Sequence, residues 1–121
     1  MSKNLIFSTT SEIIRIPDDK VVYIAADGNY SAINTADGAK YTLTMQLGQI
    51  ETRLSQMIAN GDNRFIRIGK SLIVNRDFII YINPSHQRLT LSDCHTFKYD
   101  VSASRDALKS LKYIIESEMI L

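Results

Sequence analysis

The segment RFIRIGKSLIVN, residues 64–75, combines an apolar, strand-like pattern with three basic residues, Arg64, Arg67 and Lys70, and contains no acidic residue. Positive charge gathered around the turn between two strands is chemistry suited to a polyanion such as a nucleic acid. The alternative is a solvated turn whose acidic partners come close only in three dimensions. Charge alone favours neither interpretation.

The charge along the chain is uneven, although the net charge is only +1. Residues 1–63 contain five Lys/Arg and seven Asp/Glu. Residues 64–112 contain nine Lys/Arg and four Asp/Glu, and residues 113–121 contain two Glu and no Lys or Arg. The middle of the chain therefore carries +5 and each flank carries −2. A basic face on a nearly neutral chain favours an anionic partner without saying which one.

Catalytic and metal-binding patterns are sparse. The two histidines and the one cysteine lack the spacing of a zinc site, and the chain has no glycine-rich phosphate loop. Cys94 and His95 are adjacent, so their side chains would point apart on a strand. The sequence leaves a nucleophilic pair open, but a lone cysteine is more often a small apolar residue. We therefore expect no enzymatic activity, no metal and no cofactor, and the single cysteine suits a reducing cytoplasm.

Hydrophobic periodicity predicts a mostly β chain with two helices. Apolar residues recur at helical spacing through residues 45–58, with Thr44 as the expected N-cap, and again from Ser104 to about residue 118. No apolar run approaches the length of a membrane span. Short β-branched runs bounded by turn residues predict antiparallel strands over residues 12–16, 20–26, 30–35, 40–44, 64–68, 71–75, 78–82, 88–91 and 96–101.

Three sequence pieces follow one another at specific distances along the chain. The most specific piece is F-x-R-x-x-x-S-x-x-V-N, matched by Phe65, Arg67, Ser71, Val74 and Asn75. The second is VVYIAADGNY, residues 21–30, and a third is RLTLSD followed by VSASR. With the helix between them, these pieces resemble the LytTR-type DNA-binding domain, a module of bacterial transcription regulators. The resemblance covers about residues 12–115, which leaves residues 1–11 as an N-terminal extension and assigns residues 12–121 to one domain.

The resemblance implies an elongated fold of small, layered antiparallel sheets with one central helix and a C-terminal helix. It also implies that loops, not a helix, enter successive major grooves of double-stranded DNA. The base-reading positions carry over to the turn after the first YI strand, to the turn before the motif serine, and to the segment before the last helix. The expected DNA-binding residues are Asn29, Tyr30, Ser31, Arg67, Lys70, Ser71, Arg76 and Arg105.

Different contacts are expected from different members of this set. Lys70, at the tip of a turn, can donate to guanine O6 or N7, and Arg105 can grip a guanine with two parallel hydrogen bonds. Arg67, Ser71 and Arg76 are expected at phosphates, which position a protein without reading sequence.

Two copies on adjacent direct repeats are expected, because one domain with three loops has a small footprint. Most family members join this domain to a receiver domain or to membrane helices, and neither fits within this chain. We therefore expect a cytoplasmic transcription regulator without its own receiver domain. Control would come from a separate signalling protein, from abundance, or from the rest of a longer chain. The alternative hypothesis is a β-rich protein-interaction module that has lost DNA binding. For Asn75 we expect a structural bond to nearby backbone.

Overall fold

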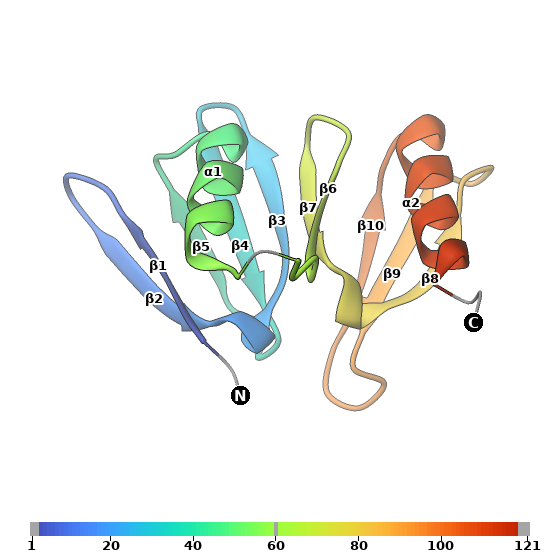
Figure 1. Cartoon of the computed structure of the whole chain (residues 1–121), viewed down its shortest axis with the longest axis horizontal. Helices are drawn as coiled ribbons and strands as arrows, with labels where there is room; N and C mark the ends of the chain where they lie inside the picture. Colours follow the sequence, from blue (N-terminus) through green and yellow to red (C-terminus); the bar gives the residue numbers. More distant parts are fainter. Residues whose placement is uncertain (1–2, 60, 119–121) are drawn as a thin grey trace.

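The computed structural model describes residues 3–59 and 61–118, which form three antiparallel sheets side by side along the long axis of the molecule (Figure 1). The first is a hairpin, the second has the order β5-β4-β3-β7-β6, and the third has the order β10-β9-β8. The strands are β1 (Asn4–Ser8), β2 (Ile13–Pro17), β3 (Val21–Asp27), β4 (Tyr30–Thr35), β5 (Lys40–Leu43), β6 (Phe65–Ile68), β7 (Leu72–Asn75), β8 (Ile79–Asn83), β9 (Arg88–Ser92) and β10 (Lys98–Ser102). The expected mostly β class with layered antiparallel sheets is confirmed.

Two helices cover the sheets. Helix α1 (Leu47–Met57) packs on the five-stranded sheet and on β1, and α2 (Arg105–Ser117) contacts β6 and β8. Short 3-10 turns, Asp18–Lys20 and Arg76–Phe78, connect β2 to β3 and β7 to β8. Neither α-helix in the described part of the chain is long and apolar enough to cross a bilayer.

Strand β7 explains why the segment around it is apolar at successive positions. Side chains on a strand alternate between the two faces of a sheet. Ile73 lies in a core beneath α1, whereas Leu72 and Val74 lie in a second core shared with α2 and the third sheet. All four residues of β7 are buried, because both faces of this strand are covered.

The helices begin where side chains supply local hydrogen-bond partners. The prediction of Ser104 as N-cap of α2 is confirmed, since its hydroxyl accepts from Ala107 N–H over 3.2 Å. Thr44 was the expected N-cap of α1, but the N-cap is Gln46, whose backbone N–H donates to Gln49 Oε1 over 2.8 Å. The chain keeps turning before the helix because Met45 N–H bonds to Leu43 O.

Strand β1 falls inside the segment expected to be an N-terminal extension. It pairs with β2, and its Leu5 and Phe7 are fully buried in the core beneath α1. Part of the stretch 1–11 is therefore built into the core, which the short apolar run Leu5–Phe7 did not indicate.

Candidate nucleic-acid interface

Three turns that are distant in sequence gather at one edge of the molecule, the upper edge of Figure 1. They are the β3–β4 turn, the β6–β7 turn, and the junction between β10 and α2. Ala26 N–H donates to Ser71 O over 2.8 Å, which ties the first turn to the second. A Cβ placed on Gly69 would lie 3.5 Å from the Ala107 Cβ, so the second turn lies against the first turn of α2. We refer to these three turns together as the upper edge.

The β6–β7 turn brings a lysine into solvent. Gly69 has a φ of +59°, a left-handed conformation that glycine adopts without the penalty other residues meet. Lys70 follows it and is exposed. The tight turn therefore presents Lys70 as expected from its place in the motif.

The structure answers the question of the three basic residues between positions 64 and 75. Arg64 forms ion pairs with Asp18 at 2.9 Å and Asp77 at 3.3 Å, and Arg67 pairs with Glu51 at 2.9 Å. Both arginines thus find acids contributed by other segments. Among the three, Lys70 is the one without an ion pair to any described residue.

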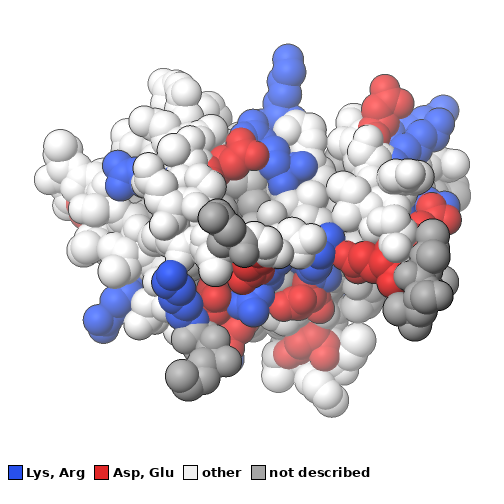
Figure 2. Space-filling view, in the orientation of Figure 1, with Lys and Arg blue, Asp and Glu red and all other residues white. Residues whose placement is uncertain are grey.

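Charges of both signs occur at the two edges. Figure 2 shows basic side chains standing out at the upper edge beside fewer acidic ones, and a mixture of acidic and basic side chains in the lower half of the view. The β4–β5 turn, which carries Asp37, and the β9–β10 loop, which carries Asp93, lie at the lower edge (Figure 1). Hydrogen bonds from the hydroxyls of Thr35 and Thr96 hold the pKa of Asp37 and of Asp93, respectively, below the usual range. These two carboxylates therefore stay ionised at the lower edge, whereas Lys70, exposed and without an ion pair to any described residue, suits an anionic partner at the upper edge.

Comparison with known proteins assigns the family. Residues 11–116 match the sequence model of the LytTr DNA-binding domain. The chain belongs to the LytTR family. It is also similar to the solved structure of a LytTr DNA-binding domain from Bacillus cereus, with a TM-score of 0.60, 23% sequence identity, and coverage of 93% of this chain and 95% of that one. At this identity the likeness concerns the fold. Comparison with curated protein sequences gives no match.

The family is one of DNA-binding domains, which accords with the expectation of a protein that is not an enzyme. Within residues 3–59 and 61–118, no group of three or more His, Cys, Asp or Glu side chains is placed to hold a metal ion. Cys94 is exposed, and no contact between it and His95 is part of the hydrogen-bond network.

The first expected reading position of this LytTR domain was left among three neighbours, and burial separates them. Asn29 is exposed in the β3–β4 turn, where its Oδ1 accepts from Gln46 Nε2 over 3.4 Å. Tyr30 is half-exposed. Ser31 is fully buried, and its hydroxyl donates to Met45 O over 2.6 Å. Ser31 thus supports the start of α1 and does not face solvent.

The other expected residues divide between the two ends of the LytTR domain. Arg105, the first residue of α2, and Ser71, the last of the β6–β7 turn, are exposed at the upper edge. Arg76 follows β7 at the opposite end of that strand. Its Nη2 lies 2.7 Å from Glu118 Oε1, and its side chain is only 17% exposed. The structure therefore does not bring Arg76 together with Lys70 and Arg105.

A fourth turn lies next to this group and was not assigned to the binding surface from the sequence. The backbone carbonyl of Gln87, in the β8–β9 turn, accepts from Ser102 Oγ and from Ala103 N–H, both over 3.4 Å. This places the turn beside the junction between β10 and α2. The residues Asn83, Pro84 and Ser85 indicate a turn, but the sequence does not show that this turn lies beside the start of α2.

Proposed function

We propose that this LytTR domain binds double-stranded DNA with sequence preference, through the turns of the upper edge, and acts as a regulator of transcription. One observation carries the proposal. Lys70 is exposed and has no acidic partner among the described residues. Its turn packs against the first turn of α2, where Arg105 is also exposed. A lysine and an arginine side by side can reach adjacent base edges in a major groove.

Backbone contacts would fix the register of the domain on the duplex. Helices α1 and α2 both begin at the upper edge (Figure 1), so their positive dipole ends point toward the proposed partner. Ser71, exposed beside Lys70, can donate its hydroxyl to a phosphate. Such contacts add affinity without reading sequence and make the affinity salt-dependent.

Two copies on adjacent direct repeats would supply the specificity that one small footprint lacks. A duplex with two repeats about one helical turn apart should then bind two copies, and more tightly than a duplex with one. Analytical ultracentrifugation on the two duplexes measures this, and one copy on the double site with undiminished affinity would contradict it. The proposal includes a cytoplasmic location, with control by a separate signalling protein, by abundance, or by the rest of a longer chain.

The decisive experiment selects bound sequences from a random DNA pool and then measures affinity for the selected site and its single-base variants. Lys70→Ala and Arg105→Ala should each lower affinity by about 1–3 kcal/mol and relax preference at one or two base pairs. Lys98→Ala, at the start of β10 on the lower edge, and Arg15→Ala, on β2, are matched controls that should change neither quantity.

Two outcomes of these experiments would contradict parts of the proposal. No selected sequence, or a selected site bound no better than a random duplex, would contradict DNA recognition and favour the protein-interaction module. Equal effects of Lys70→Ala and Lys98→Ala would show that DNA is bound through a different surface. Thermal melts on every variant separate loss of contact from loss of fold, because all four side chains are exposed.

A further inference from the structure

We propose that Arg67 is a positioning residue, which together with Glu51 of α1 fixes the shape of the β6–β7 turn that presents Lys70. The sequence motif suggested a phosphate contact for Arg67. The hydrogen bonds of its guanidinium point instead to a role within the chain, which deepens the proposed function and rests on it for the reading of DNA.

Three nitrogens of the Arg67 guanidinium have acceptors within the domain. Nε donates to Gly69 O over 3.2 Å, Nη2 to Lys70 O over 3.3 Å, and Nη1 to Glu51 Oε1 over 2.9 Å. The first two acceptors are consecutive carbonyls of the turn itself. Residues 69–71 lie beyond the last paired positions of the hairpin, so their carbonyls need donors from outside the strand ladder.

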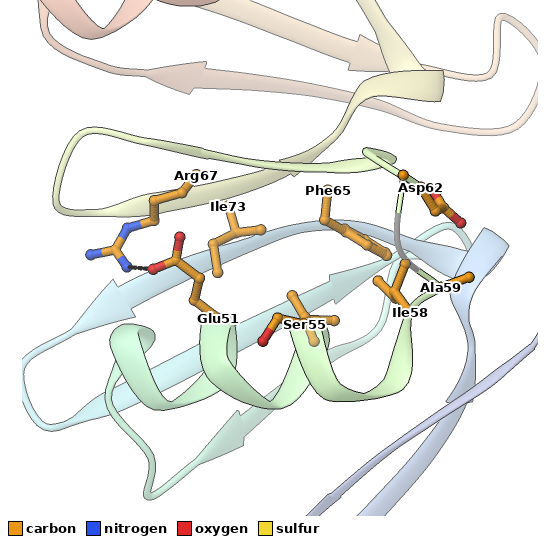
Figure 3. A pocket seen from close by; sticks show the side chains of 10 residues that line it. Glu51, Ser55, Ile58, Ala59, Asp62, Phe65, Arg67 and Ile73 are labelled. Carbon is orange, nitrogen blue, oxygen red and sulfur yellow. Dashed lines mark hydrogen bonds and ion pairs between the residues drawn. The ribbon is translucent and has the colours of Figure 1, made fainter.

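Glu51 connects this arginine to a helix on the other side of a hollow. Figure 3 shows Arg67 and Glu51 facing one another across the space between β6 and α1, with Phe65 and Ile73 lining it. The hollow lies between β6 and α1, and Arg67 and Glu51 are both among its lining residues. Their ion pair therefore links α1 to the arginine that holds the turn, while Gly69 and Ala107 bring the turn against α2.

Arginine has the geometry that this role requires. Its planar guanidinium presents five N–H donors in a fixed fork, so it can hold two carbonyls and a carboxylate at once. A lysine would keep the charge but not the fork. With 27% exposure for Arg67 and 53% for Glu51, the pair contributes little to the free energy of unfolding. Its effect is expected on the position of Lys70 and not on overall stability.

Glu51→Gln gives different predictions for positioning and for simple electrostatics. Removing an acid near a DNA-binding edge should raise affinity for all sequences if only charge matters. If Glu51 positions the turn, discrimination at the base pair read by Lys70 should instead fall about fivefold to tenfold, the lower part of the effect of losing a base contact. Asp27→Asn is the matched control, because Asp27 is an exposed acid at the end of β3, close to the same edge.

Arg67→Lys separates positioning from phosphate contact. A phosphate contact would be largely rescued by lysine, with an unchanged salt slope and unchanged base preference. Positioning predicts that the salt slope is kept while discrimination at the Lys70 base pair falls as in Glu51→Gln. Rescue of both quantities by lysine would overturn the inference.

A measurement without DNA keeps this inference separate from the proposed function. Backbone amide order parameters of Gly69, Lys70 and Ser71, measured by NMR relaxation on the free domain, should fall in Glu51→Gln and Arg67→Lys but not in Asp27→Asn. Melting temperatures should stay within about 3 °C of the unmodified protein, as for a weak surface pair. Unchanged order parameters would overturn the inference even if DNA binds as proposed. Absence of DNA binding by the unmodified chain would instead contradict the proposed function. The NMR result alone would then decide whether Arg67 and Glu51 position the turn.

Discussion

Asn75 is the last residue of the most specific sequence motif, and substituting it tests whether this motif position stabilises the fold or contacts DNA. Its side chain is fully buried; Nδ2 donates to Val21 O over 2.9 Å, and Oδ1 accepts from Asp77 N–H over 3.0 Å. It thereby connects the start of β3 to the end of β7 and caps the turn that follows. The expectation of a structural role is confirmed, and one of its two partners lies 54 positions away in sequence.

Asn75→Ala removes both hydrogen bonds. A net value of about 0.5–1.5 kcal/mol for each gives a loss of about 2 kcal/mol in the free energy of unfolding. An unfolding entropy of about 2.1 cal/mol/K per residue amounts to about 0.25 kcal/mol/K for a chain of 121 residues. The melting temperature should therefore fall by about 8 °C.

Urea denaturation followed by circular dichroism, together with thermal melts, measures the loss. Asn34→Ala is the control, because Asn34 is also nearly buried in the central sheet but makes one bond of 3.3 Å to Ala32 O within its own strand. Its effect should be about half as large. Well below the melting temperature, the base preference of Asn75→Ala on selected DNA should match that of the unmodified chain.

Two results would refute this reasoning. A stability loss for Asn75→Ala below about 0.5 kcal/mol, the range of ordinary surface substitutions, would mean that the two bonds do not hold the strands together. A changed base preference at full stability would place Asn75 in DNA recognition.

Three further substitutions test particular placements. Ser31→Ala should lower the free energy of unfolding by about 1 kcal/mol and leave base preference unchanged, because the hydroxyl is buried; altered base preference in a binding assay would contradict this. The hydrogen bond from the Thr96 hydroxyl lowers the pKa of Asp93 in the folded state. The ionised Asp93 therefore stabilises the folded protein fully above the ordinary pKa of 3.8, and this stabilisation is lost as the pH falls below 3.8. Asp93→Asn should therefore show a shallower fall in melting temperature from about pH 4 to pH 2, and parallel curves for the two proteins would exclude this cause. Gly69→Ala and its control Gly38→Ala should each lower the free energy of unfolding by about 1–2 kcal/mol, because both glycines have a positive φ. The added Cβ meets only an ordinary 3.5 Å contact at Gly69 and open space at Gly38. A much larger loss of stability for Gly69→Ala in urea denaturation would indicate a tighter approach to α2.

Elements with a regular period could be predicted from the sequence. The spacing of Leu47, Ile50 and Leu54 predicted α1, and these three residues are the buried ones of that helix. The continuous apolar run Leu72–Val74 predicted a strand covered on both faces, because successive side chains of a strand point to opposite faces of the sheet. The ordered motifs identified the family, and the hydrogen bond of Ser104 confirmed the predicted start of α2.

Strand ends and caps were less well determined, because they depend on single hydrogen bonds. The last strand was expected from residue 96 but begins at Lys98. The Asp93 carboxylate accepts the backbone N–H groups of His95, Thr96 and Phe97, which keeps these residues in the loop. An aspartate five residues before a strand can form such a loop or face solvent, and the sequence does not distinguish the two.

The partners of charged and polar side chains were decided by tertiary structure alone. Arg67 meets Glu51 of α1 across 16 positions of sequence, and Arg64 meets Asp18 from the turn before β3. Arg76, next to the motif in sequence, lies at the far end of β7, whereas Arg105, on another element, reaches the upper edge. Sequence patterns report periodicity within an element, and they predicted which residues are buried along β7 and α1. Ion pairs and the gathering of Lys70 and Arg105 depend on how three sheets and two helices pack, because that packing sets which turns share an edge.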